Sequence, residues 1–142
     1  MAETAPNPGT ILSSAVDAEI AKFRTLQGEV GKLRSDLQFV LGQRTENEIV
    51  QQELSLIDDG SSNVIYKKIG PVLIKQDLDE AKETVKKRLE YIGGEKEKLD
   101  NKIAAKEKEG NELAMKVQQM QSQLQATTAE AVRAIAEQHQ QK

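Results

Sequence analysis

The fold of this 142-residue chain is decided by residues 63–76, which read Asn63-Val64-Ile65-Tyr66-Lys67-Lys68-Ile69-Gly70-Pro71-Val72-Leu73-Ile74-Lys75-Gln76. Two runs rich in β-branched residues flank Gly70-Pro71, which is the pattern of two strands joined by a two-residue turn. Gly70 can supply the positive φ that the first position of a type II′ turn requires. The stretch therefore predicts a β-hairpin in which Ile69 pairs with Val72.

This pairing places apolar side chains on both faces of the hairpin. Two strands alone are marginally stable in water, and their unpaired edges tend to join a larger sheet. We therefore expect hairpins from several chains to form an inter-subunit β-barrel, which makes the protein an obligate oligomer. One predicted face carries Ile65, Ile69, Val72 and Ile74, and the other carries Val64, Tyr66 and Leu73. The predicted assembly surface is Val64, Ile65, Tyr66, Ile69, Gly70, Pro71, Val72, Leu73 and Ile74.

A heptad repeat lies on each side of the hairpin, in stretches without proline. Apolar residues alternate at steps of three and four, which is typical of a coiled-coil seam. The pattern predicts helices over 11–57 and 78–125, each about 45–48 residues long, or about 70 Å at 1.5 Å per residue. The first seam contains Val16, Phe23, Val30, Leu37, Leu26, Leu33, Val40 and Leu54; the second contains Leu89, Ile103, Val117, Leu124, Ile92, Leu99, Leu113 and Met120.

The hairpin turns the second helix back along the first, so the two seams can pack antiparallel within one chain. Paired positions should then have residue numbers that sum to about 135. Polar residues interrupt both seams. Arg44 and Asn47 either specify the register or reach solvent. The predicted defects of the second seam are Lys96, Lys106 and Gly110.

Both ends of the helical pair are predicted to lie together, away from the hairpin. A two-helix coiled coil buries one stripe, so apolar residues near its ends are incompletely covered and can hold apolar segments of another chain. The residues 1–10 are predicted to be a disordered leader, and 126–142 either extend the second helix or are disordered. The predicted client-binding tip comprises Ile11, Leu12, Val16, Ile20, Phe23, Val117, Met120 and Leu124.

The composition argues against catalysis and against several kinds of partner. The chain has no Cys and one His, so thiolate chemistry and imidazole clusters are excluded, and we expect no enzyme, metal or cofactor. Asp58-Asp59-Gly60 lacks the spacing of a calcium loop and predicts a turn. The net charge of −3 gives no general attraction to nucleic acid, and no apolar run is long enough to span a membrane. We therefore expect a cytoplasmic protein.

The hairpin and its neighbours resemble the β-class prefoldin family. The resemblance is carried by Thr45-Glu46-Asn47-Glu48-Ile49-Val50, by residues 63–76, and by Lys87-Arg88-Leu89-Glu90-Tyr91-Ile92, and it covers roughly residues 12–125. It implies a mainly α fold: a long antiparallel two-helix coiled coil joined by one β-hairpin. It further implies a hetero-hexamer of α-class and β-class subunits, assembled through β-barrels. The residues from Val64 to Gln76 would form the assembly surface.

The resemblance also implies a function. A prefoldin captures unfolded actin, tubulin and other chains and delivers them, without using ATP, to the cytosolic chaperonin. The alternative is a structural coiled-coil adaptor that joins folded proteins, which would use the apolar stripes without needing the hairpin. An enzyme is disfavoured, because the sequence contains no nucleophile–base pair, metal set or phosphate loop.

Overall fold

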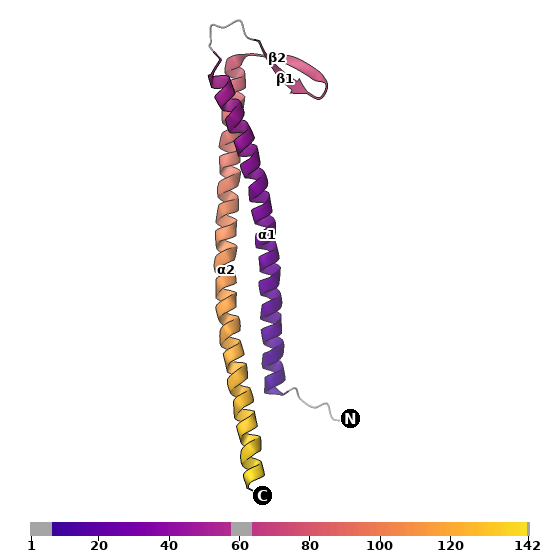
Figure 1. Ribbon diagram of the computed structural model, residues 1–142, viewed down its shortest axis with the longest axis vertical. Coiled ribbons are helices and arrows are strands. Elements are labelled where there is room, and N and C mark those ends of the chain that lie inside the picture. The colour runs from indigo at the N-terminus through magenta and orange to yellow at the C-terminus, as the bar shows by residue number, and fades with distance from the viewer. Residues whose placement is uncertain (1–6, 58–63, 142) are drawn as a thin grey trace. The chain divides into compact units, whose positions relative to one another are not determined.

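A computed structural model describes residues 7–57 and 64–141 of the chain. Most of the predicted leader, residues 1–6, and the predicted turn cluster 58–63 lie outside the described residues. Two long helices and one two-stranded antiparallel hairpin make up the fold (Figure 1), which confirms the predicted mainly α fold class. The elements are α1 (Pro8–Ser55), β1 (Ile65–Ile69), β2 (Val72–Gln76) and α2 (Leu78–Gln140).

The helix α1 begins at Pro8, so residues 8–10 are helical and do not belong to a disordered leader. Asn7 caps the helix: its Oδ1 accepts a hydrogen bond from the Gly9 amide at 2.8 Å, and its carbonyl accepts the amides of Thr10 and Ile11. Asn is a favoured N-cap, and Pro is suited to the first helical position because its fixed φ is already helical. The cap and the proline together place the start of α1 three residues earlier than predicted.

The helix α2 continues to Gln140, 15 residues beyond the predicted end at residue 125. The extension contains five alanines and no Gly or Pro, so its intrinsic helix propensity is high. Thr127 and Thr128 donate their hydroxyls to the carbonyls of Gln123 and Leu124 and so do not interrupt the helix. The segment 126–140 is therefore a helical extension, which the sequence had left open against disorder.

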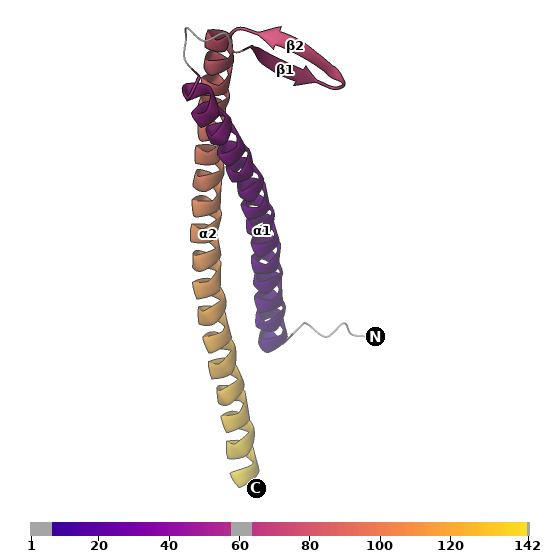
Figure 2. The same cartoon turned by 45° about the horizontal axis from the view of Figure 1, so that its top comes forward.

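The hairpin has the register predicted from its turn. Ile69 pairs with Val72, and Ile65 pairs with Gln76 at the other end of the ladder. Gly70 has φ +58°, and no other described residue has positive φ. A type I′ turn needs positive φ at both central positions, whereas type II′ needs it only at the first, so the backbone of Gly70 is that of the predicted type II′ turn. Figure 2 shows β1 and β2 side by side.

The described chain divides into two compact units, and each contains antiparallel segments of α1 and α2. The first unit includes residues 7–31 and 104–141. In it, Glu29 pairs with Lys106 and Glu19 with Lys116, and each pair of residue numbers sums to 135. The predicted register is therefore confirmed in this unit. Arg44 and Asn47, in the second unit, form hydrogen bonds within α1, to Glu48 and to the carbonyl of Gln43.

The second unit includes residues 32–57 and 64–103, and its core lies where the helices approach the hairpin. The side chains of Leu54, Ala81 and Val85 are buried there. Four partly buried side chains pack against them, and one of the four belongs to the hairpin. These are Ile57, Ile65, Leu78 and Leu89. The core thus joins the end of α1, the start of α2 and β1.

Gly110 occupies a seam position and is the one buried glycine of the described helices; Gly28, Gly31, Gly42, Gly93 and Gly94 are exposed. A Cβ atom at Gly110 would lie 3.3 Å from Leu26 Cδ2 and 3.8 Å from Phe23 Cε2. A Cβ at Gly28 or Gly93 would meet nothing within 4 Å. The predicted seam defect Gly110 therefore leaves a space on α2, here called the notch, which the side chains of Leu26 and Phe23 on α1 occupy.

This difference predicts opposite effects of enlarging two glycines. Gly93→Ala should raise the free energy of unfolding by about 0.5–1 kcal/mol, because alanine favours the helix and the position is open. Gly110→Val should lower it by about 1–3 kcal/mol, because the larger side chain displaces Leu26. Urea unfolding followed by circular dichroism measures both changes. Equal stabilisation by the two substitutions would contradict the notch.

Candidate functional site

The hairpin exposes apolar side chains on both of its faces. Ile69, Val72 and Ile74 are about half exposed on one face, and Tyr66 and Leu73 are at least as exposed on the other. Of the hairpin residues, Ile65 alone packs on the core of the second unit. The two-stranded sheet leaves the outer edges of β1 and β2 unpaired by any strand among the described residues. Unpaired strand edges of this kind can form hydrogen bonds with strands of another chain.

The predicted tip residues all lie in the first unit, but most of them belong to the helix–helix seam. Val16 is 5% exposed and is covered by its own helix pair. Ile11, which is 55% exposed, is the one exposed member of the predicted set. A side chain already packed in a seam offers little surface to a client. The half-buried members of the predicted set are Leu12, Ile20, Phe23, Val117, Met120 and Leu124.

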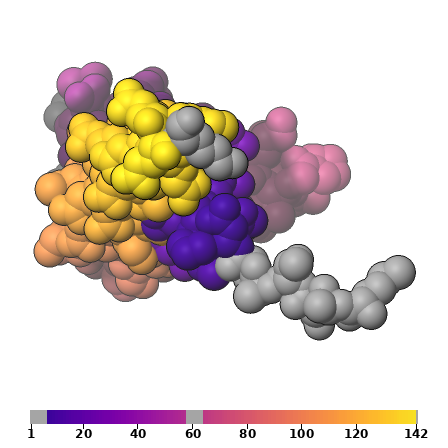
Figure 3. Space-filling view, turned by 90° about the horizontal axis from the view of Figure 1, so that it is seen from below, coloured from indigo at the N-terminus to yellow at the C-terminus, as the bar shows by residue number. Residues whose placement is uncertain are grey.

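Two apolar residues that the sequence reading did not assign to the tip are more exposed. In the register of the ion pairs, Pro8 lies opposite residue 127, so α2 extends past the start of α1 (Figure 1). Every residue from 128 to 141 is exposed, including Val132 (62%) and Ile135 (58%). Figure 3, seen from below, shows the yellow end of α2 in front of the indigo start of α1. Val132 and Ile135 thus add an uncovered apolar surface near Ile11's end of α1.

A buried carboxylate links the two helices near this end. Glu19 Oε1 accepts hydrogen bonds from Lys22 and from Lys116, each at 3.2 Å, while Glu19 Oε2 is buried without a partner. Hydrogen bonds from Lys116 and then Lys22 hold the pKa of the Glu19 carboxyl below its ordinary value, against an opposing effect of burial. Glu19 lies seven residues before Leu26, so the heptad could have identified it as a seam residue.

The second interhelical ion pair joins Lys106 Nζ to Glu29 Oε2 at 2.7 Å. The hydrogen bond to Glu29 raises the pKa of Lys106 above its ordinary value. Both side chains are partly exposed, so the pair contributes more to register than to stability. Lys106 was predicted to be a defect of the seam; it is instead one of the residues that align the helices.

The described residues contain neither a candidate metal site nor a helix that could cross a membrane. No group of three or more His, Asp or Glu side chains within 7–57 and 64–141 is arranged to hold a metal. No described helix is long and apolar enough to cross a bilayer.

Comparison with known proteins agrees with this architecture. A family model described as "Prefoldin subunit" matches residues 17–141. The chain belongs to the prefoldin family. Mouse "Prefoldin subunit 6" is 36% identical over 119 residues, covering 84% of this chain and 92% of the mouse protein. The Arabidopsis thaliana protein of the same name is 42% identical over 112 residues, covering 75% and 83% of the two chains.

The chain is also similar to one prefoldin chain of known structure. The prefoldin beta subunit from Thermococcus strain KS-1 is 22% identical in sequence, with a TM-score of 0.49, and the match covers 80% of this chain and 91% of that one. The family, established by sequence, identifies this chain as a prefoldin chaperone subunit with a helical coiled-coil fold.

The Glu19 contacts predict a specific loss of stability in acid. A carboxylate whose folded pKa is depressed stabilises the fold above its unfolded pKa, about 4.3, and this stabilisation is lost as the pH falls through the folded pKa. Glu19→Gln should lower the melting temperature at pH 7. Below about pH 4, the wild type should lose this advantage and the two melting temperatures should converge.

The control is Glu112→Gln, since Glu112 is exposed and forms no ion pair among the described residues. Melting curves from pH 7 to pH 3 measure all three proteins. A constant difference between wild type and Glu19→Gln across this range would refute the role of the Glu19 charge.

Proposed function

We propose that this chain is a non-enzymatic subunit of a cytoplasmic, hetero-hexameric co-chaperone that works without ATP. In this proposal it assembles with other α-class and β-class prefoldin subunits, captures unfolded actin, tubulin and other chains, and delivers them to the cytosolic chaperonin. The observation that carries the proposal is the hairpin with apolar side chains exposed on both faces. An adaptor that used only its helices would have no need of such a hairpin.

The assembly surface is the sheet formed by β1 and β2. Burying about 25 cal/mol per Å² of apolar surface would stabilise a barrel in which neighbouring hairpins cover Tyr66 and Leu73 on one face and Ile69, Val72 and Ile74 on the other. The unpaired strand edges would gain the backbone hydrogen bonds that they lack in the single chain. Both gains require partner subunits.

The client-binding surface lies near the ends of α1 and α2 in the first unit. Its exposed apolar members are Ile11, Val132 and Ile135. The seam residues predicted for this role, such as Val16, contribute indirectly, because they hold together the two helices that carry this surface. An uncovered apolar surface without deep pockets suits unfolded chains, whose apolar segments have no fixed shape.

The assembly proposal predicts a defined change in native mass. Wild-type protein mixed with α-class partner subunits should reach the mass of a hetero-hexamer. Leu73→Asp should prevent this, because the new charge lies in the sheet-to-sheet contact. Met115→Asp is the matched control, since Met115 is similarly exposed but lies on α2, far along the chain from the hairpin. Native mass spectrometry distinguishes the outcomes, and full assembly by Leu73→Asp would exclude the hairpin as the joint.

The client proposal predicts that substitutions can weaken client binding without lowering the melting temperature of the complex. In the assembled complex, Val132→Ser with Ile135→Ser should weaken suppression of denatured actin aggregation, because apolar surface is lost, and should leave the melting curve unchanged, because both residues are exposed. Val16→Ser should instead lower the melting temperature, because Val16 is buried. Light scattering with denatured actin measures protection. Equal protection by the exposed-residue variant and the wild type would remove these residues from the site.

A further inference from the structure

Two of the four aromatic residues of this chain are exposed in the second unit, away from the hairpin. Phe39 on α1 is 68% exposed, and Tyr91 on α2 is 71% exposed. Neither occupies a seam position, and neither belongs to the surfaces proposed above. Aromatic side chains are enriched where proteins meet partners, so their position calls for a further explanation.

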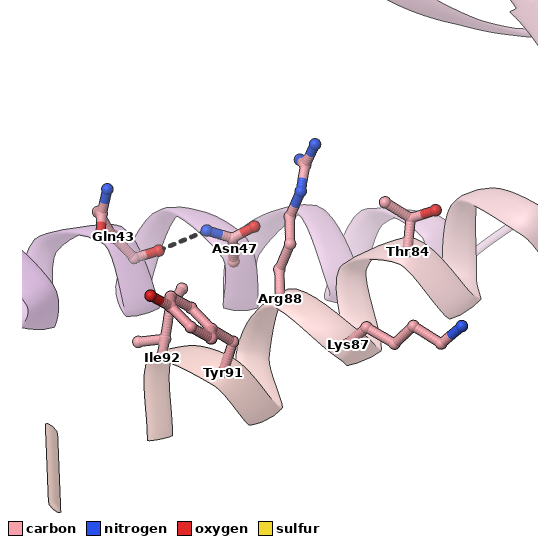
Figure 4. A pocket seen from close by; sticks show the side chains of 7 residues that line it. All are labelled: Gln43, Asn47, Thr84, Lys87, Arg88, Tyr91 and Ile92. Atoms are coloured by element: carbon pink, nitrogen blue, oxygen red, sulfur yellow. Dashed lines mark hydrogen bonds between the residues drawn. The ribbon is translucent and has the colours of Figure 1, made fainter. Parts of the chain in front are cut away.

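Tyr91 lines a groove between α1 and α2 with a volume of about 580 Å³. Figure 4 shows the groove from close by, with Asn47 donating its amide to the carbonyl of Gln43 at 2.7 Å. The buried side chain of Ile92 lies at its base. The lining residues are Gln43 and Asn47 from α1, and Thr84, Lys87, Arg88, Tyr91 and Ile92 from α2.

The apolar surface extends beyond the groove along α1. Phe39 precedes the lining residue Gln43 by four positions, and Val50 follows Asn47 by three. Residues at these spacings lie on the same side of a helix. Phe39 and Val50 are both exposed. Exposed apolar side chains therefore lie along α1 on both sides of the groove.

The α2 edge of the groove carries two positively charged side chains. Lys87 and Arg88 are exposed, and neither forms an ion pair in the part of the chain that the structure describes. Figure 4 shows the Arg88 side chain extended away from α2, whereas the Lys87 side chain lies alongside the helix. Glu46, an exposed carboxylate on the opposite edge, forms no ion pair either. The groove therefore has an apolar base with a basic edge on α2.

We propose that this groove docks an amphipathic helix of a partner protein, with its apolar stripe on the exposed rings of Tyr91 and Phe39 and an acidic flank against Lys87 and Arg88. A helix laid between two antiparallel helices packs its apolar side chains into the groove that they form, as in other helix-in-groove complexes. Carboxylates on the flank nearest α2 complement the basic edge and orient the helix. This docking site is separate from both the assembly hairpin and the client surface.

The probe is a fluorescent 18-residue helical peptide with a leucine stripe and a glutamate flank, tested against the assembled complex by fluorescence anisotropy. The same peptide with lysine in place of glutamate tests the charge requirement. We expect the glutamate peptide to bind at least about 10-fold more tightly than the lysine peptide, a difference of about 1.4 kcal/mol.

The groove variant is Arg88→Glu with Tyr91→Ser, and its matched control is Lys108→Glu with Met115→Ser. Both double variants reverse one exposed charge and remove one exposed apolar side chain, and the control residues lie outside the groove. The groove variant should bind the glutamate peptide at least about 10-fold more weakly, and the control should bind it like the wild type. Unchanged melting curves show that both variants fold.

Three results would overturn the proposal. The first is absence of binding to the wild type. The second is equal affinity for both peptides, or an equal loss of affinity in both double variants, which would indicate nonspecific apolar contact. The third is a reduced native mass of the complex formed by the groove variant, which would show that the groove is occupied by another copy or subunit of the assembly itself.

Discussion

The carboxylate of Glu19 lies buried at a seam position of α1, where it is held by the ammonium groups of Lys22 and Lys116. A buried carboxylate is tolerated only with such partners, because breaking the pair would leave an uncompensated charge. If the helices slid past one another by a turn, Lys116 would move about 5.4 Å away and Glu19 would lose its interhelical partner. The Glu29–Lys106 pair imposes the same alignment ten residues along α1. These two contacts therefore set the antiparallel register on which the coverage of apolar residues in the first unit depends.

Coverage by one partner helix explains which surfaces remain exposed. Each helix can bury only one stripe against the other, so Val16 and Leu26 are buried while Val132 and Ile135, beyond the first residue of α1, are not. The second unit follows the same principle at the hairpin, where the core of Leu54, Ala81 and Val85 reaches only Ile65. The rest of the hairpin is too far from the helices to be covered within its own unit. The surfaces proposed for partner subunits and for clients are thus those that two helices cannot cover.

The sequence predicted the hairpin well because its determinants are local. Gly70 allows positive φ, the flanking runs favour strands, and together they fix the pairing of Ile69 with Val72. The two helices and their register followed from the heptads. The tip was predicted less well, because exposure depends on where the partner helix begins and ends. The Asn7 cap was not recognised, and residues 126–142 were left open between a helical extension and disorder, so Val132 and Ile135 were not assigned to the tip. Lys106 and Gly110 were taken for defects because their roles depend on Glu29, Leu26 and Phe23 across the seam.

The seam does not account for Phe39 and Tyr91, since a two-helix coiled coil gains nothing from aromatic rings on its outer side. Their exposure is not a consequence of an uncovered end either, because α1 and α2 both continue on either side of them within the second unit. The rings flank a groove that exposed Lys87 and Arg88 also line. A third helix would cover the rings and bring carboxylates to the cations in one arrangement. The same constraint that leaves the hairpin open thus leaves this groove open, because two helices alone cannot complete it.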